Sequence, residues 1–172
     1  RKPAAKGKAR QSWCLNNLRQ LGLSWVLYKD DYEGRLPSSC ALDPFGRPNT
    51  NAWVMGDMSD NRATYGQVNP GILDSTNVNG IKRGKLYPYN GNPSIYRCPS
   101  DPARTAGVPK VRSYSMNCWM GSWRSANSLV YALNETSWKI FLADAEIPRP
   151  SDFFVLVGEH EKRINDGWFV VD

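Results

Sequence analysis

Residues 14–28 read CLNNLRQLGLSWVLY, and this stretch decides the fold that we expect. Apolar residues recur in it at steps of 4, 3, 4 and 3, a spacing that places side chains on one side of an α-helix. These stripe residues are Cys14, Leu18, Leu21, Trp25 and Tyr28. The residues expected to widen the stripe are Leu15, Gly22 and Val26. Gly34 and Pro37 supply a stop signal, so the sequence predicts one long helix over residues 1–33.

The start of this helix carries bare positive charge. Residues 1–10 contain five Lys or Arg residues, no acidic residue, and no Ser, Thr, Asp or Asn that could cap a helix. The amino end of a helix already carries partial positive charge, so this is an unusual place for a helix to begin. We therefore expect residues 1–33 to be the lower half of a longer helix that begins upstream.

The positive charge of the chain is concentrated in that helix. The 172 residues carry a net charge of +6, of which residues 1–29 supply seven Lys or Arg and no acid. The remaining residues contain 15 basic and 16 acidic side chains. A nucleic-acid-binding domain normally shows a basic face on its folded body as well, so we expect no nucleic-acid partner. The length suits one domain over residues 1–172, and no run of about 18 apolar residues marks a membrane span.

Four cysteines, Cys14, Cys40, Cys98 and Cys118, accompany a single histidine, His160. The lack of a Cys-x-x-Cys pair argues against a zinc site, and an even count favours disulfides in an oxidising compartment over buried thiols. Three pairings are possible. We expect Cys98–Cys118, because turn residues between them could return one strand beside another, and hence Cys14–Cys40. A Cys14–Cys98 link would contradict that pairing.

Residues 34–98 are expected to form a loop-rich excursion. Turn-forming Gly, Pro, Asn and Asp cluster at residues 43–49, 69–71 and 90–93. One short helix is expected from Asp74 or Ser75 to about Lys85. Four aromatic residues are expected to anchor the excursion on the domain rather than to stack on a ligand: Trp53, Tyr65, Tyr87 and Tyr89.

Residues 99–172 are expected to form an antiparallel sheet region. Runs of strand length fall at residues 111–116, 128–132, 139–144, 153–157 and 168–171. Asn165-Asp166-Gly167 is a hairpin-type turn before the last run. The amino-terminal helix is the element long enough to cover this sheet. The fold expected is α+β, with one long helix packed on an antiparallel sheet and a long loop-rich excursion.

Four blocks of sequence resemble the bacterial type II secretion pseudopilin-like proteins, a prepilin-type cleavage and methylation family. The blocks are CLNNLRQLGL at 14–23 with Tyr28, Asp31 and GRLP at 34–37, then YRCPSDP at 96–102, RSYSMN at 112–117, and EH at 159–160 with INDGWF at 164–169. They follow the family's order. DPFGRP at 43–48 is similar to the Asp-Pro-aromatic-Gly segment of major pseudopilins. The sequence departs from the family around His160, where Gly158, Lys162 and Arg163 replace acids and a serine.

The resemblance implies a pilin-like fold and a structural role without catalysis. The chain would be a subunit of a type II secretion pseudopilus or a related type IV pilus-like filament that supports protein export. Its partners would be other pseudopilin subunits and the secretion machinery. An apolar helix half, together with the basic end of residues 1–10, would anchor it at the inner membrane. Its domain would lie in the periplasm or in a cell-surface filament.

The resemblance also suggests a cofactor, because some major pseudopilins hold calcium in a loop. The candidate ligands are the acids of the final third: Asp144, Glu146, Asp152, Glu159 and Asp166. Calcium takes several carboxylate and carbonyl oxygens, which loops can supply. Ordinary solvated loop acids are the alternative.

Two rival functions stay open at this point. One is a secreted module that binds carbohydrate or nucleic acid through exposed aromatics of residues 53–89. The other is a hydrolase built on His160. Glu159 and Glu161 would face away from the His160 imidazole in an extended strand, which is a poor arrangement for a catalytic triad. The sequence contains no Gly-x-Ser-x-Gly and no nucleotide-binding loop, so we expect no catalytic residue.

Overall fold

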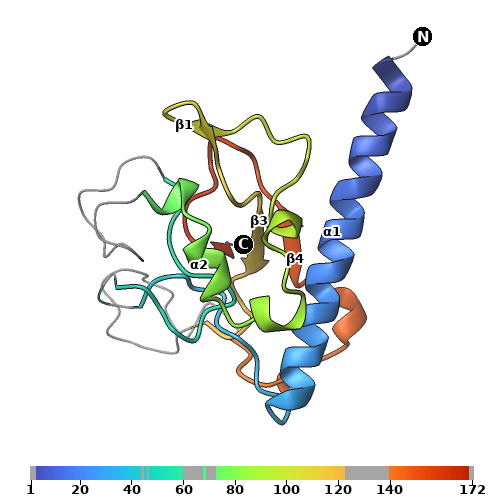
Figure 1. The fold of residues 1–172 in the computed structure, drawn as a ribbon. Helices are drawn as coiled ribbons and strands as arrows, with labels where there is room; N and C mark the ends of the chain where they lie inside the picture. The colour runs from blue at the N-terminus through green and yellow to red at the C-terminus, as the bar shows by residue number, and fades with distance from the viewer. Residues whose placement is uncertain are drawn as a thin grey trace.

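The fold is α+β, as expected, with one long helix beside a body of short strands, turns and loops (Figure 1). The computed structural model describes residues 3–43, 45, 47–59, 68, 73–122 and 140–170, with only the backbone for residues 3–9. The long helix is α1 (Pro3–Asp31). The helical turns that follow are η1 (Asp74–Thr76), α2 (Asn79–Lys82), η2 (Tyr87–Tyr89), η3 (Pro93–Tyr96), η4 (Asp144–Glu146) and η5 (Pro150–Asp152). The strands are β1 (Arg104–Thr105), β2 (Val108–Pro109), β3 (Tyr114–Asn117), β4 (Leu156–Gly158) and β5 (Trp168–Phe169).

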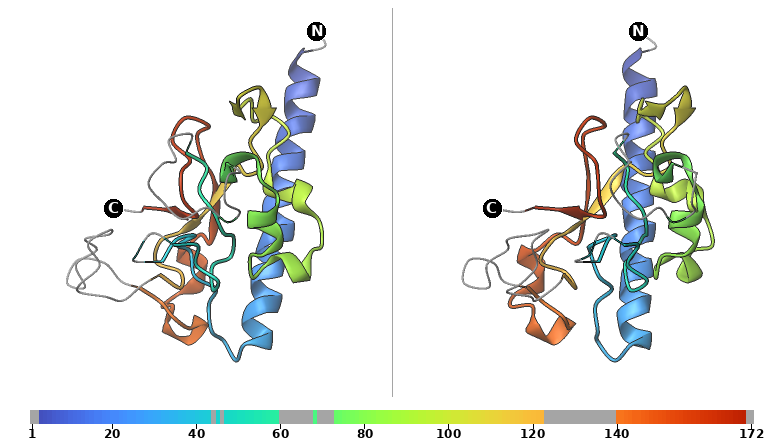
Figure 2. Two further views of the ribbon diagram at one scale, coloured as in Figure 1. Left: turned by 60° about the vertical axis from the view of Figure 1, so that its left-hand side comes forward. Right: turned by 90° about the vertical axis from the view of Figure 1, so that its left-hand side faces the viewer.

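Helix α1 ends where the sequence predicted. The Gly34 N–H donates to the Lys29 carbonyl at 2.7 Å, and Gly34 adopts a φ of 82°. A Cβ at this position would lie 2.5 Å from a carboxylate oxygen of Asp144, so glycine suits both the conformation and the space. At its other end, α1 extends past the body of the domain (Figures 1 and 2). The helix is therefore docked only along its later turns.

The small sheet has the order β4-β3-β5, with β3 at its centre. β4 pairs with β3 in antiparallel register, with Met116 opposite Leu156. β5 pairs with the other edge of β3 in parallel, with Met116 opposite Trp168. The parallel pairing differs from the expected antiparallel sheet. The parallel pairing arises because the chain after β4 crosses β3, through the turn around Asp166, and β5 then pairs with the far edge of β3 instead of with β4.

Several predicted elements are shorter in the structure than in the sequence analysis. The run at 139–144 forms isolated bridges, Met120 with Phe141 and Arg35 with Ala143, before η4 begins. The run at 128–132 lies outside the described residues. The helix expected over 74–85 is split into η1 and α2 at Asn77, whose backbone is extended and whose side-chain oxygen accepts the Asn79 N–H at 3.0 Å.

The core lies between α1 and the body. Leu21, Trp25 and Tyr28 bury their side chains in one cluster with the central strand and the loop-rich excursion. The body contributes Trp53, Ile81, Leu86, Tyr96, Tyr114, Met116, Met120 and Phe141 to this cluster. Trp53 is wholly buried and its indole N–H donates to the Gly167 carbonyl at 2.8 Å. Tyr87 and Tyr89 pack partly against the cluster, whereas Tyr65 lies outside the described residues.

Candidate functional site

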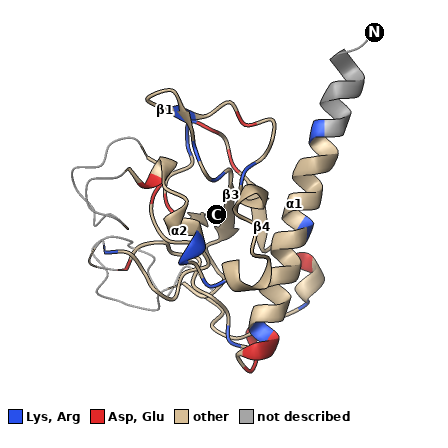
Figure 3. Ribbon diagram, in the orientation of Figure 1, with Lys and Arg blue, Asp and Glu red and all other residues tan. Residues whose placement is uncertain are grey.

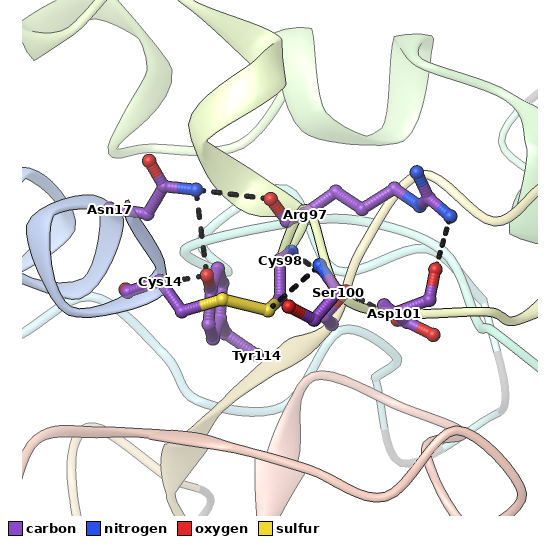
Figure 4. Close-up of a disulfide and its surroundings, with 8 residues drawn as sticks. Cys14, Asn17, Arg97, Cys98, Ser100, Asp101 and Tyr114 are labelled. Atoms are coloured by element: carbon purple, nitrogen blue, oxygen red, sulfur yellow. Dashed lines mark hydrogen bonds between the residues drawn. A yellow bond between two sulfur atoms is a disulfide. The ribbon is translucent and has the colours of Figure 1, made fainter. Parts of the chain in front are cut away.

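Helix α1 is fastened to the body near its middle by one disulfide and a small set of hydrogen bonds (Figure 4). Cys14 is bonded to Cys98, with their Cα atoms 5.0 Å apart. The Asn17 side-chain amide donates to the Arg97 carbonyl at 3.0 Å, and the Tyr114 hydroxyl donates to the Cys14 carbonyl at 3.4 Å. These contacts fix both the position and the rotation of the helix.

The disulfide shows that the expected pairing was wrong. Cys98 follows η3, which packs against α1, so its nearest cysteine is Cys14 and not Cys118. Cys40 and Cys118 are thiols and lie buried in one cluster with Trp168. The Cys40 Sγ lies 3.2 Å from the Ser122 hydroxyl oxygen. The prediction failed because it assumed that the chain between Cys98 and Cys118 would fold back on itself, whereas the segment at Cys98 packs against the helix.

The side of α1 that faces away from the body carries four exposed apolar side chains. The exposed helix face, as we define it, consists of Leu15, Leu23, Val26 and Leu27, whose side chains are 62%, 59%, 38% and 41% exposed. Leu15 and Val26 were expected to widen the buried stripe, and the structure places them on this opposite side. The stripe itself is confirmed at Leu21, Trp25 and Tyr28, which are buried. Two more of its members also meet the body, Leu18 through the core cluster and Cys14 through the disulfide.

The charges of α1 lie mainly at its ends, as Figure 3 shows for the lower one. There the Lys29 ammonium pairs with Asp30 at 2.8 Å and with Asp144 at 3.2 Å. Arg19 is an exposed charge between Leu15 and Leu23. Clustered exposed apolar side chains on one side of a helix are typical of a contact surface. The exposed helix face is therefore the candidate functional surface, and it supplies packing rather than chemistry.

Sequence reasoning missed Leu23 and Leu27 as members of this surface. The available signal was that the stretch at 14–28 is apolar on two sides of the helix instead of one. The sequence could not say which side is docked. That choice is made by Arg97 and Cys98, which lie far along the chain and meet Asn17 and Cys14.

A buried arginine pins the turn before β5 to the central strand. The Arg112 guanidinium is inaccessible to solvent and donates to the carbonyls of Tyr114 at 2.7 Å, Asn165 at 3.1 Å, and Asp166. It also lies 5.7 Å from the ring centroid of Trp53. Burial lowers the pKa of Arg112 to about 10, although the negative charges of nearby carboxylates oppose this. The guanidinium also contacts the Ser115 hydroxyl at 3.3 Å, and most of its hydrogen bonds end on backbone carbonyls, so the network is structural.

Asp166 belongs to the same buried region. Burial raises the pKa of Asp166 to about 6, against the opposing effects of the Trp168 indole N–H and the Arg112 charge. Its carboxylate accepts hydrogen bonds from the Trp168 backbone at 3.4 Å and from the Trp168 indole. Asp166 therefore positions Trp168 within the domain.

The five acids proposed as calcium ligands do not form a site. Each acid has a different partner: Asp144 pairs with Lys29, Glu146 accepts the Leu142 N–H, Asp152 pairs with Arg149, Glu159 contacts the Ser115 hydroxyl, and Asp166 contacts Trp168. Within the described residues, no three His, Cys, Asp or Glu side chains gather closely enough to hold a metal ion. The described part of the chain therefore gives no support to the calcium suggestion.

His160 is exposed at the surface. Its Nδ1 accepts the Lys162 N–H at 3.2 Å and lies 3.7 Å from a carboxylate oxygen of Glu161. The aromatic residues of the excursion also fit a packing role, since Trp53 is buried and cannot stack on a ligand. These observations do not favour either rival function of the sequence analysis.

The described residues line at least two cavities. We call the first the tyrosine pocket, and its volume is about 530 Å³. It adjoins the carboxyl end of α1, and its lining includes Tyr28, Tyr32, Arg35 and Lys85. The second, of about 430 Å³, lies between the β1–β2 hairpin and residues 161–165. Sequence reasoning identified neither, because each is assembled from segments that are distant in the sequence.

A comparison with known protein families finds one family that matches most of the chain. The family described as "Protein of unknown function (DUF1559)" matches residues 3–145, which include α1, β3 and the segment up to η4. No curated protein and no solved structure matches the chain. Among the described residues, no helix combines the length and the apolar character that crossing a membrane requires. Because the match covers most of its length, the chain belongs to the DUF1559 family.

Proposed function

We propose that this chain is the outward-facing domain of a structural subunit in a type IV pilus-like filament, related to type II secretion pseudopilins. The observation that carries the proposal is the exposed helix face. Leu15 and Leu23 are both more than half exposed on a helix that extends past the body. The α+β pilin-like fold and membership of a family associated with pilin-like proteins support the same role.

In this proposal the work of the chain is mechanical. Its α1 packs against the helices of neighbouring subunits, and apolar side chains of the exposed helix face exclude water there. An apolar helical segment continuous with α1 anchors the subunit in the inner membrane, and the body lies in the periplasm or at the cell surface. The other partners are the proteins of the secretion machinery, and no catalytic step is assigned to any residue.

The Cys14–Cys98 disulfide supports this arrangement in two ways. It is typical of proteins that fold in an oxidising compartment such as the periplasm. It also fastens the helix to the body, so that force applied along α1 reaches the body through a covalent bond. Hydrogen bonds from Asn17 reinforce the same junction.

The test changes two residues of the exposed helix face without disturbing the fold of the domain. We expect Leu23→Glu combined with Val26→Glu, in the full-length protein in its own bacterium, to remove the protein from filaments sheared off the cells. A charge placed in a packed helix interface is strongly unfavourable because it loses hydration without gaining a partner. The matched control is Phe45→Glu, which adds an acid at an exposed apolar position outside α1.

The purified domains provide the folding check. Both altered domains should melt close to the parent, since Leu23 and Val26 do not belong to the core cluster. Filaments that form normally with both glutamates present would overturn the proposal. Recovery of the natural protein solely as a monomer that is never associated with membranes or filaments would do the same.

A further inference from the structure

The tyrosine pocket has the features of a preformed site for a small ligand. Its volume of about 530 Å³ falls within the range of small-molecule sites, roughly 300–1,000 Å³. Its walls come from α1, the loop that follows it, and four segments further along the chain, at Asn51, Lys85, Gly121–Ser122 and Leu142. Backbone hydrogen bonds hold these segments together: Leu36 N–H to the Leu142 carbonyl, Ser38 N–H to the Asn51 carbonyl, and Lys85 N–H to the Ala52 carbonyl, each at 2.9 Å. The walls are therefore rigid before any ligand arrives.

The charge of the pocket is positive. Arg35 and Lys85 line it, and no acidic residue does. Within the described part of the chain, neither side chain makes a hydrogen bond or an ion pair. Two acids beside the segments that line the pocket are already engaged, Asp31 by the Tyr89 hydroxyl at 2.9 Å and Asp144 by Lys29. Two cations without a protein partner favour an anionic ligand.

The remaining lining suits a polar ring. Tyr28 and Tyr32 stack with their ring centroids 4.3 Å apart and contribute two phenol groups to one wall. Burial and the neighbouring Tyr32 raise the pKa of Tyr28, and the charge of Arg35 opposes the increase. Hydroxyl and amide groups come from Ser38, Asn51 and Ser122. Such a mixture of aromatic, hydroxyl and amide groups can contact both the ring and the hydroxyls of a sugar.

We propose that the tyrosine pocket binds a small sugar acid of the uronic-acid class, with its carboxylate held by Arg35 and Lys85. A guanidinium matches a carboxylate with two parallel hydrogen bonds, and the ammonium adds a second charge. The sugar ring lies against the tyrosine wall, where its hydroxyls meet the serine and asparagine groups. This site does not rest on the proposed filament role, because it is built on the body and on the carboxyl end of α1, away from Leu15 and Leu23.

The test uses the whole 172-residue chain labelled with ¹⁵N, titrated with D-glucuronate and followed by NMR. We expect saturable shifts of the amide signals of Leu36, Lys85 and Ser122, with an affinity that falls as salt rises. Arg35→Gln and Lys85→Gln should each weaken binding about tenfold, the loss expected when one charged hydrogen-bonding partner is removed. Arg104→Gln, which removes a cation from the second cavity, is the matched control and should bind as the parent does.

Two further ligands identify what the pocket recognises. D-glucose tests the ring without the carboxylate, and inorganic phosphate tests the charge without the ring; both should bind much more weakly than glucuronate. Melting curves show whether Arg35→Gln and Lys85→Gln remain folded. Three results would overturn the proposal: no saturable shift with glucuronate, equal binding of glucose or phosphate, or a loss of binding in Arg104→Gln but not in the pocket variants.

Discussion

The docking of α1 can be tested at Trp25, whose side chain is 7% exposed and sits in the middle of the buried stripe. Trp25→Ala removes a large aromatic side chain from the core and should lower the free energy of unfolding by about 3–5 kcal/mol. For a chain of this length, such a loss lowers Tm by roughly 6–20 °C. Thermal and urea unfolding, followed by circular dichroism with the disulfide intact, measure this change.

A second substitution at the same position tests the reasoning more sharply. The Trp25 indole N–H is buried and has no hydrogen-bond partner among the described residues. Trp25→Phe keeps most of the apolar burial and removes this donor, whose burial without a partner costs about 1–3 kcal/mol. We expect Trp25→Phe to unfold within about 1 kcal/mol of the parent.

The outcomes separate packing from other effects. The matched control is Leu23→Ala on the exposed side of α1, which should change stability by no more than about 0.5 kcal/mol. A Trp25→Ala domain that melts with the parent would show that α1 is not docked through this stripe. A Trp25→Phe domain as unstable as Trp25→Ala would refute the argument about the buried donor.

Three further predictions follow from charge and cysteine chemistry. The pKa of Asp166 is raised to about 6 in the folded chain, so its contribution to stability is complete below the unfolded value near 3.8 and is lost as pH rises through 6. Relative to Asp166→Asn, the parent should therefore lose about 2–3 kcal/mol between pH 4 and pH 7, and parallel stability curves would contradict this. Cys40 and Cys118 are 2% and 0% exposed, so iodoacetamide should modify both thiols only in denaturant, and modification of the native protein would contradict their burial. Mass spectrometry of the unreduced digest should find Cys14 linked to Cys98. Removal of residues 1–10 deletes five of the 22 basic residues and leaves 17 basic residues against 16 acidic ones. The shortened chain should keep its fold and show no affinity for DNA at low salt, whereas tight binding that survives the deletion would reveal a basic face on the body.

The long helix could be predicted from sequence because its signal is repeated over many turns. The stripe from Leu18 to Tyr28 and the stop at Gly34 agree with α1. The rotation of the helix was only partly predictable. Leu15 and Val26 are as apolar as the buried residues, and only the contacts of Asn17 and Cys14 with the segment at 97–98 determine which side is docked.

The sheet was harder to predict because its strands are two to four residues long. Every residue of β3 is buried, so the alternation that marks a half-exposed strand is absent there. The parallel pairing of β5 depends on Arg112, which binds the carbonyls of the turn beside β3. No local pattern reveals such a contact between residues more than 50 positions apart.

The candidate sites were the least predictable part. Acidic residues in loops suggested calcium, but each acid is engaged by a different neighbour. The tyrosine pocket draws Arg35 and Lys85 from segments that neither periodicity nor composition connects. A cavity is a property of the assembled walls, so it emerges only once the long-range hydrogen bonds are known.

The central claim is that the exposed helix face becomes buried between subunits, and the accessibility of one residue tests it most directly. Leu23→Cys places a thiol at a position that is 59% exposed, while Cys40 and Cys118 are buried and the other two cysteines are disulfide-bonded. The control is Phe45→Cys, at a site that is 80% exposed and outside α1. We expect a polar maleimide to label both variants as purified domains. In filaments sheared from cells that produce the full-length protein, it should label Phe45→Cys and leave Leu23→Cys unmodified. Equal labelling of Leu23→Cys in the purified domain and in the filaments would contradict the account.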